Sequence, residues 1–199
     1  RAKSAQAYAS NFNDPLLKDQ WNLINNAPFE GKSVVGADVQ IEEAWKLNTG
    51  DPSIIVAVLD EGIDVNHPDL KDNMWQNEGE IYGSTEDNDN NGYIGDRHGY
   101  NFIADCGVIS ADDVYDTGHG THVAGVIAAV NNNGIGISSV AGGNGNQSGV
   151  KIMSCQIFSG NLAGTVLAEV QAIKYAADNG AVILQCSWGY ISGSANRSE

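Results

Sequence analysis

The sequence predicts an α/β fold with a doubly wound parallel sheet. Three apolar segments that are expected to be strands alternate with two expected helices, an order typical of parallel strands joined by right-handed crossovers. The strands are expected at residues 54–59, 150–158 and 181–186, and the helices at 119–130 and 165–177. Ligands of such sheets bind beyond the carboxyl ends of the strands, so the residues that follow the strands are the first candidates for a site.

Each of these elements has its own sequence pattern. Residues 54–59 are apolar on both faces, as in a central parallel strand. Residues 119–130 are rich in small side chains, which predicts a tightly packed helix with Thr117 as N-cap and an Asn/Gly stop at 131–134. The helix over 165–177 is predicted from one apolar stripe. That stripe consists of Val166, Val170, Ile173 and Ala177.

The chain is expected to have two parts. Residues 1–39 are rich in loops, with breakers at 13–15 and 27–28, and are expected to form an N-terminal arm that packs on the core. Residues 40–199 are expected to form that core. A short helix over 39–47 and a short strand over 100–103 are also predicted.

Composition excludes several classes of function. The 199 residues contain 10 Lys and Arg against 25 Asp and Glu, so the formal net charge is −15. This charge argues against binding to nucleic acid or to an anionic membrane surface. The longest clean apolar run, residues 54–59, is too short to span a bilayer. The three cysteines show no ligand spacing, so neither a disulfide framework nor a zinc site is indicated.

The acidic residues are concentrated in one part of the chain, with 15 of the 25 between Asp60 and Asp116. Such density is typical either of a solvated face or of a site for a hard cation. Residues 87–98 resemble the opening of an EF-hand-type calcium loop, but position 12 is His98 instead of Glu and no helices flank it. An Asn/Asp/Gly surface turn is the alternative. The expected ligands are Asp87, Asp89, Asn91, the Tyr93 carbonyl and Asp96.

Asp60 and His119 are the candidate catalytic pair. Asp60 ends an apolar strand and His119 opens a helix, so the two can face each other across the crevice of a doubly wound sheet. A carboxylate in that place would hold the tautomer of a general-base imidazole, while the helix dipole would disfavour a protonated ring at rest. As alternatives, Asp60 could be a turn or capping residue, and His119 with His122 could bind zinc, although the zincin pattern His-Glu-x-x-His is absent.

Three motifs resemble those of the subtilisin-like serine proteases. The stretch 58–64, followed by His-Pro-Asp-Leu at 67–70, is similar to their aspartate region. His-Gly-Thr-His-Val-Ala-Gly at 119–125 is similar to their histidine motif, and Ser-Trp-Gly at 187–189 to their substrate strand. The order Asp, His, Ser is the order of the triad in that family.

The resemblance implies a role for each matched residue. Asp60 would orient His119, His119 would be the general base, and His122 would be structural. The backbone of Ser187, Trp188 and Gly189 would pair with an extended peptide or protein substrate. Ser187 could instead be taken for a nucleophile, but it lacks the Gly-x-Ser-x-Gly elbow.

The resemblance also implies Ca2+ bound between the arm and the core. Three side chains and three carbonyls would supply six oxygens, a suitable calcium shell. The side chains are those of Asp14, Asp69 and Asn133, and the carbonyls are those of Val130, Ile135 and Ile137. The alternative for 131–133 is a simple helix stop.

The resemblance covers only the N-terminal portion of a subtilisin-like catalytic domain, truncated at its C-terminal side. Neither the Gly-Thr-Ser-Met-type segment with the nucleophile nor the Ala-Gly-Asn-type segment with the oxyanion asparagine occurs in the 199 residues. This chain alone is therefore expected to have no proteolytic turnover. A non-catalytic, calcium-dependent peptide-binding module is the alternative function.

Three further expectations follow from the resemblance. The strand at 181–186 should be left as an open apolar edge, so that the chain is swapped, dimeric or paired with a C-terminal fragment. Cys155 and Cys186 should be free, buried thiols on strands either side of the first strand. The protein is expected to be secreted or in the cell envelope, with no membrane span.

Overall fold

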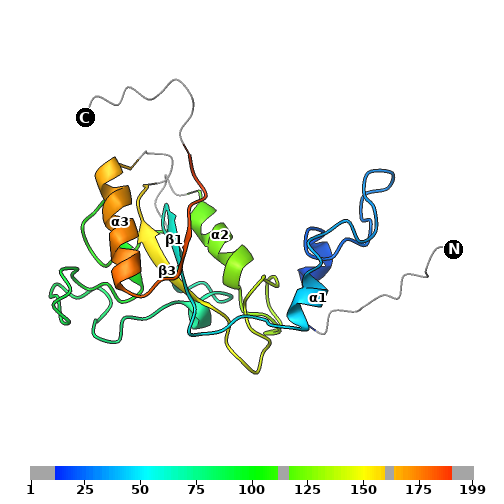
Figure 1. Cartoon of the computed structure of the whole chain (residues 1–199), viewed down its shortest axis with the longest axis horizontal. Helices are drawn as coiled ribbons and strands as arrows, with labels where there is room; N and C mark the ends of the chain where they lie inside the picture. The colour runs from blue at the N-terminus through cyan, green and yellow to red at the C-terminus, as the bar shows by residue number, and fades with distance from the viewer. Residues whose placement is uncertain (1–11, 112–116, 160–163, 190–199) are drawn as a thin grey trace, which may run out of the picture. The chain divides into compact units, whose positions relative to one another are not determined.

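The computed structural model of the chain describes residues 12–111, 117–159 and 164–189 (Figure 1). Its contacts divide the chain into two compact units. The first unit contains residues 1–55, 65–74 and 124–152, and the second contains residues 56–64, 75–123 and 153–199.

A four-stranded sheet has the order β2-β3-β1-β4. Val56 of β1 is paired in parallel with Ile183 of β4, and Gly99 of β2 with Ser154 of β3. These pairings agree with the predicted parallel sheet, and β1 lies between β3 and β4 as expected. The strands are β1 (Ile55–Asp60), β2 (Gly99–Asn101), β3 (Lys151–Gln156) and β4 (Ile183–Gln185).

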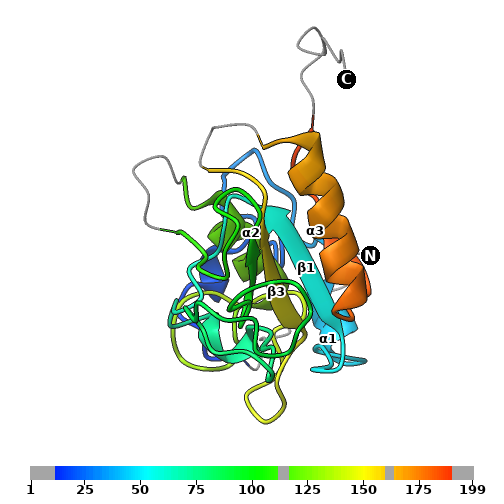
Figure 2. The ribbon, with the colours of Figure 1, turned by 90° about the vertical axis from the view of Figure 1, so that its left-hand side faces the viewer.

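Helices cover both sides of β1 and β3. Helix α3 (Val166–Asp178) lies on one side, and the first turn of α2 (His119–Ala128) lies on the other (Figures 1 and 2). The hydroxyl of Thr165 caps α3 by accepting a hydrogen bond from the backbone N–H of Ala168. Five of the six residues of β1 are buried, as the apolar run predicted. The strand end that carries Asp60 is thereby fixed.

The buried face of α3 differs from the predicted one. The expected stripe is open to solvent, with Val166 39%, Val170 58% and Ile173 44% exposed. Small side chains instead let α3 approach the sheet closely, with one tyrosine among them. The buried residues of this face are Ala168, Ala172, Tyr175 and Ala176. Apolar periodicity predicted the helix correctly but not the side that packs.

Strand β4 lies at one edge of the described sheet and is largely uncovered. Val182, Ile183 and Leu184 are all exposed, as expected for an open apolar edge. For the same reason one cysteine prediction was wrong: Cys155 on β3 is buried, but Cys186, just after β4, is exposed. Because β4 has a neighbouring strand, β1, on one side only, the residue that follows it is not shielded on the other side.

The first unit contains the described part of the N-terminal arm and its own small core. Leu17, Leu23 and Ile41 form a buried cluster, against which Phe12 and Trp45 pack. This cluster joins residues on both sides of the expected boundary at 39/40. The short helices are η1 (Leu17–Asp19), α1 (Ile41–Trp45) and η2 (Lys71–Asn73).

Candidate active site

Asp60 and His119, predicted as a pair, are in direct contact. Asp60 is the last residue of β1 and His119 is the first residue of α2. The His119 Nδ1 atom lies 2.8 Å from Asp60 Oδ1 and 2.9 Å from Oδ2. The carboxylate is 5% exposed, whereas the imidazole is 48% exposed. A buried acid therefore holds one ring nitrogen of a base that solvent reaches.

The pKa of His119 is raised above its ordinary value, chiefly by the hydrogen bond to Asp60. Partial burial of the ring opposes this, while the charges of Asp60 and Glu61 add to it. The helix dipole alone was expected to disfavour the protonated ring. The adjacent carboxylates act in the opposite direction from the dipole, and the pKa of His119 is raised.

Glu61 is a functional neighbour that sequence reasoning missed. It is 5% exposed, and its Oε1 accepts hydrogen bonds from the backbone N–H of Thr117 at 3.0 Å and of His119 at 2.6 Å. The Thr117 hydroxyl also donates to this oxygen, at 2.7 Å. Thr117 is therefore not the N-cap of α2 that was expected, because its hydroxyl is turned toward Glu61. The glutamate supplies the acceptor at the start of this helix.

The glycine and threonine after His119 fit α2 against the loop that follows β1. A Cβ on Gly120 would lie 2.1 Å from the carbonyl oxygen of Gly62, so only glycine allows this approach. The Thr121 hydroxyl accepts a hydrogen bond from the backbone N–H of Asp64 at 3.0 Å. Residue types at 120 and 121 therefore help to place His119.

The expected substrate strand lies near the end of β1. The Trp188 indole N–H donates to the Leu59 carbonyl at 3.0 Å, and its ring meets Phe158 edge-to-face with centroids 5.8 Å apart. Ser187 and Gly189 on either side are exposed. Trp188 therefore ties residues 187–189 to Leu59, the residue before Asp60 on β1. Ser187 and Gly189 remain open to solvent.

The side chains expected to bind calcium at the arm lie together in the first unit. Asp14 Oδ2 accepts from the Asn132 backbone at 2.9 Å, and its Oδ1 from the Asn133 backbone at 3.1 Å. Asp69 Oδ1 lies 2.7 Å from Asn133 Nδ2, and its Oδ2 accepts from the Ile137 backbone at 3.0 Å. Both carboxylates are buried. Burial is the first cause of the raised pKa of Asp69, and the charge of Asp14 adds to it.

The three backbone carbonyls expected at the arm site are available as ligands. Within the described ranges, no hydrogen-bond donor meets the carbonyl oxygen of Val130, Ile135 or Ile137. The side-chain oxygen of Asn133 accepts from the Ile135 backbone at 2.9 Å.

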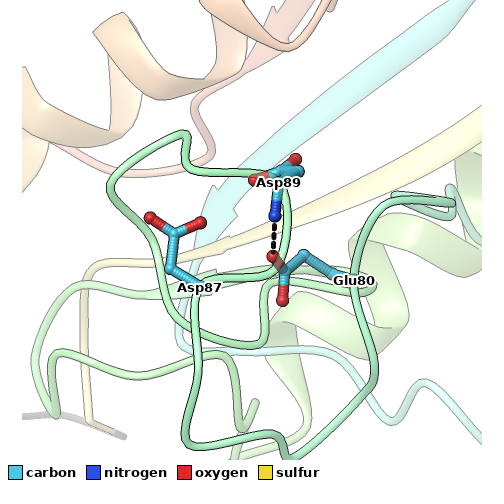
Figure 3. Close-up of side chains that lie close together, drawn as sticks. All are labelled: Glu80, Asp87 and Asp89. Carbon is cyan, nitrogen blue, oxygen red and sulfur yellow. Dashed lines mark hydrogen bonds between the residues drawn. The ribbon is translucent and has the colours of Figure 1, made fainter.

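The acidic loop brings two of its predicted ligands to a third carboxylate. Glu80, Asp87 and Asp89 each place an oxygen within 4.8 Å of the others (Figure 3). Glu80 lies outside the loop pattern and was missed by sequence reasoning. It is buried, and it accepts from the backbone N–H of Asp89 at 2.9 Å and of Gly95 at 3.2 Å.

The other expected loop ligands have different partners. Asp96 is fully buried and accepts from the Tyr175 hydroxyl at 2.6 Å and from Asn91 Nδ2 at 3.0 Å. Tyr93 packs its ring edge-to-face on Tyr175, with centroids 4.7 Å apart. Among the described residues, the group of three carboxylates that could hold a metal ion contains neither Asp96 nor the pair His119 and His122.

Comparison with known proteins identifies the family. The sequence profile of the subtilase family matches residues 51–199, which include Asp60, His119 and 187–189. The chain belongs to the subtilase family. Subtilisin-like protease 1 of Plasmodium falciparum (isolate 3D7) is 33% identical over 190 residues, covering 94% of this chain and 25% of that protein. Protease KEX1 of Kluyveromyces lactis is 34% identical over 182 residues, covering 90% of this chain and 19% of that protein.

Solved structures of proteases show the same fold. The serine protease of Aeromonas sobria in complex with its chaperone has a TM-score of 0.64 at 24% identity, covering 90% of this chain and 26% of that one. Fervidolysin from Fervidobacterium pennivorans, a keratinolytic enzyme related to subtilisin, has a TM-score of 0.52 at 29% identity. The match covers 90% of this chain and 22% of that one. The predicted fold class is thereby confirmed. This subtilase chain spans roughly a quarter of its relatives' length.

The described helices of the subtilase chain include none with the length and apolar character needed to cross a bilayer.

Proposed function

We propose that this chain supplies the orienting aspartate, Asp60, and the general-base histidine, His119, of a subtilisin-like serine endopeptidase that hydrolyses peptide bonds. The observation that carries the proposal is the contact of the buried Asp60 carboxylate with the His119 imidazole. Because Asp60 occupies Nδ1, the neutral tautomer with Nδ1–H is favoured and Nε2 is left to take a proton from a serine hydroxyl. The raised pKa of His119 is consistent with an imidazolium stabilised by Asp60.

In this proposal, the substrate lies along residues 187–189. An extended peptide would pair with their backbone as an added strand. The anchoring of Trp188 to the Leu59 carbonyl supports this role, because it ties the segment to the strand that carries Asp60.

The serine nucleophile would come from polypeptide outside the 199 residues. His119 can take and return a proton while Asp60 orients its ring, but an acyl-enzyme needs a hydroxyl that attacks the carbonyl. We therefore expect no proteolysis by this chain alone. The open faces of β4 and α3 are consistent with covering by that additional polypeptide, a swapped copy or a C-terminal fragment.

We further propose that Ca2+ binds at the arm. The proposal is supported by the two buried carboxylates of Asp14 and Asp69, which lie with Asn133 at one place, where Asn133 Nδ2 is 2.7 Å from Asp69 Oδ1. The carbonyls of Val130, Ile135 and Ile137, which meet no donor in the described part of the chain, would add hard oxygen ligands. The ion would join Asp14 of the arm to the loop after α2.

A second Ca2+ is proposed at the acidic loop, with Glu80 added to the predicted ligands Asp87, Asp89, Asn91, Tyr93 and Asp96. The proposal is supported by three like-charged carboxylates held within 4.8 Å of one another, since a divalent cation would relieve their repulsion. We also propose that the protein is secreted or in the cell envelope.

Fluorophosphonate labelling tests the enzymatic proposal. The 199-residue chain is expected to remain unlabelled, whereas a longer polypeptide that adds the family's serine segment should be labelled in a His119-dependent manner. Labelling of the short chain would overturn the assignment of an external serine. Failure of the longer, folded polypeptide to label would favour the peptide-binding alternative.

Metal analysis tests the two calcium sites. Equilibrium dialysis should find two Ca2+ and no zinc per chain. The number of bound Ca2+ should fall to one in Asp69→Asn, and likewise to one in Glu80→Gln. Glu78→Gln, at an exposed glutamate nearby, is the matched control. An unchanged ion count in either site variant would remove that site.

A further inference from the structure

Glu61 follows the catalytic aspartate directly, yet the proposed proton transfer does not use it. Its carboxylate is 5% exposed. Burying a carboxylate is costly unless donors compensate it, so the contacts of Glu61 show where it stabilises the structure.

These contacts converge on the turn that opens α2. One carboxylate oxygen receives the Thr117 hydroxyl and backbone N–H and also the backbone N–H of His119. Between Thr117 and His119 lies Gly118, with a positive φ of 74°. Glycine is permissive at such a φ and does not rigidify the chain. Glu61 bridges this flexible point by binding the residues on both sides of it.

Consecutive residues of one strand end therefore hold His119 at two places. Asp60 binds the imidazole, and Glu61 binds the backbone of the same residue. The negative carboxylate also lies where the N–H groups and dipole of α2 favour an anion.

We infer that Glu61 is a positioning residue, which fixes the first turn of α2 to the end of β1 and thereby keeps the His119 ring against Asp60. The inference rests on the proposed function of that pair. In this role Glu61 acts through the backbone of His119. Loss of its carboxylate should let the turn at Gly118 open and the imidazole leave Asp60.

NMR of the 199-residue chain with 15N-labelled histidine tests the inference without needing activity. The hydrogen-bonded Nδ1–H of His119 should give a low-field proton signal that disappears in Asp60→Asn. In Glu61→Ala this signal should be lost, and the His119 backbone amide should exchange at least about tenfold faster, because a hydrogen bond to a charged group is removed.

Conservative variants separate positioning from general stability. Glu61→Gln keeps an acceptor of the same reach and should retain the signal, whereas the shorter Glu61→Asp should weaken it. Glu78→Gln is the control for removing a glutamate charge. If Glu61→Ala does not fold, the comparison of the Nδ1–H signal between Glu61→Gln and Glu61→Asp still tests the positioning role.

The outcomes distinguish the inference from the function on which it rests. If the wild-type chain lacks an Asp60-dependent signal, the proposed function fails. If the wild type shows it and Glu61→Ala or Glu61→Asp retains it with unchanged amide exchange, Glu61 is not a positioning residue.

Discussion

Both carboxylate oxygens of Asp60 lie within 3 Å of a single atom, the Nδ1 of His119, at 2.8 and 2.9 Å. The acid comes from the end of a buried strand and the base from the first residue of a helix.

The Asp60–His119 contact should make stability depend on pH. The pKa of His119 is raised in the folded chain from its ordinary value of 6.5. The contact therefore stabilises the fold fully below about pH 6.5, and this contribution is lost as the pH rises through the folded pKa. A double-mutant cycle with Asp60→Asn and His119→Gln, measured by urea unfolding at several pH values, should give a coupling that falls with pH. A coupling that grows with pH would contradict this assignment.

Gly120→Ala should destabilise the chain by about 1–3 kcal/mol, because its Cβ would lie 2.1 Å from the Gly62 carbonyl oxygen. Gly125→Ala on the same helix is the matched control. Its Cβ would lie at an ordinary 3.6 Å from Ile137, so improved helix propensity should stabilise by about 0.5–1 kcal/mol. Urea denaturation measures both variants. Equal effects would show that close packing at Gly120 is not required.

Calcium should stabilise the chain through the arm site. At a free concentration of 100 Kd, a bound ion adds about 2.7 kcal/mol to the free energy of unfolding. The rise in Tm between chelator and Ca2+ should therefore shrink in Asp69→Asn. It should persist in Asp19→Asn, which changes an exposed acid of η1. The same rise in all three proteins would count against ligation by Asp69.

The thiols should differ in reactivity. Cys186 is exposed and should react with a maleimide in the native chain, more slowly than a free thiol because partial burial raises its pKa. Cys155 is fully buried and should react only after unfolding. Mass spectrometry of the wild type and Cys186→Ser locates the label. Rapid native labelling of Cys155 would contradict its burial, and protection of Cys186 that grows with protein concentration would indicate pairing through β4.

The strands and helices were predictable because their signals are local. The apolar run at 54–59 and the small-residue run from His119 each located an element, and the motifs at their ends located Asp60 and His119. The packed face of α3 was not predictable, because Val166, Val170 and Ile173 form a better apolar stripe than the alanines that pack. The size of the side chains decides which face of α3 can pack on the sheet, and the periodicity of apolar residues carries no information on size.

Glu61 and Glu80 were missed for a related reason. Each has its partners across a loop: Glu61 binds residues 56 and 58 positions later, and Glu80 binds residues 9 and 15 positions later. No spacing rule relates a buried glutamate to backbone donors that the fold brings to it. Glu61 would have stood out only as an acid next to Asp60 at a strand end.

The imidazole pKa of His119, followed by NMR titration in the wild-type chain and in Asp60→Asn, tests the central claim most directly. The account predicts a pKa above the ordinary histidine value in the wild type and a clear decrease in the variant, in which the carboxylate charge is gone. The same pKa in both proteins, with both folded, would show that Asp60 does not act on His119 and would contradict the proposed acid–base pair.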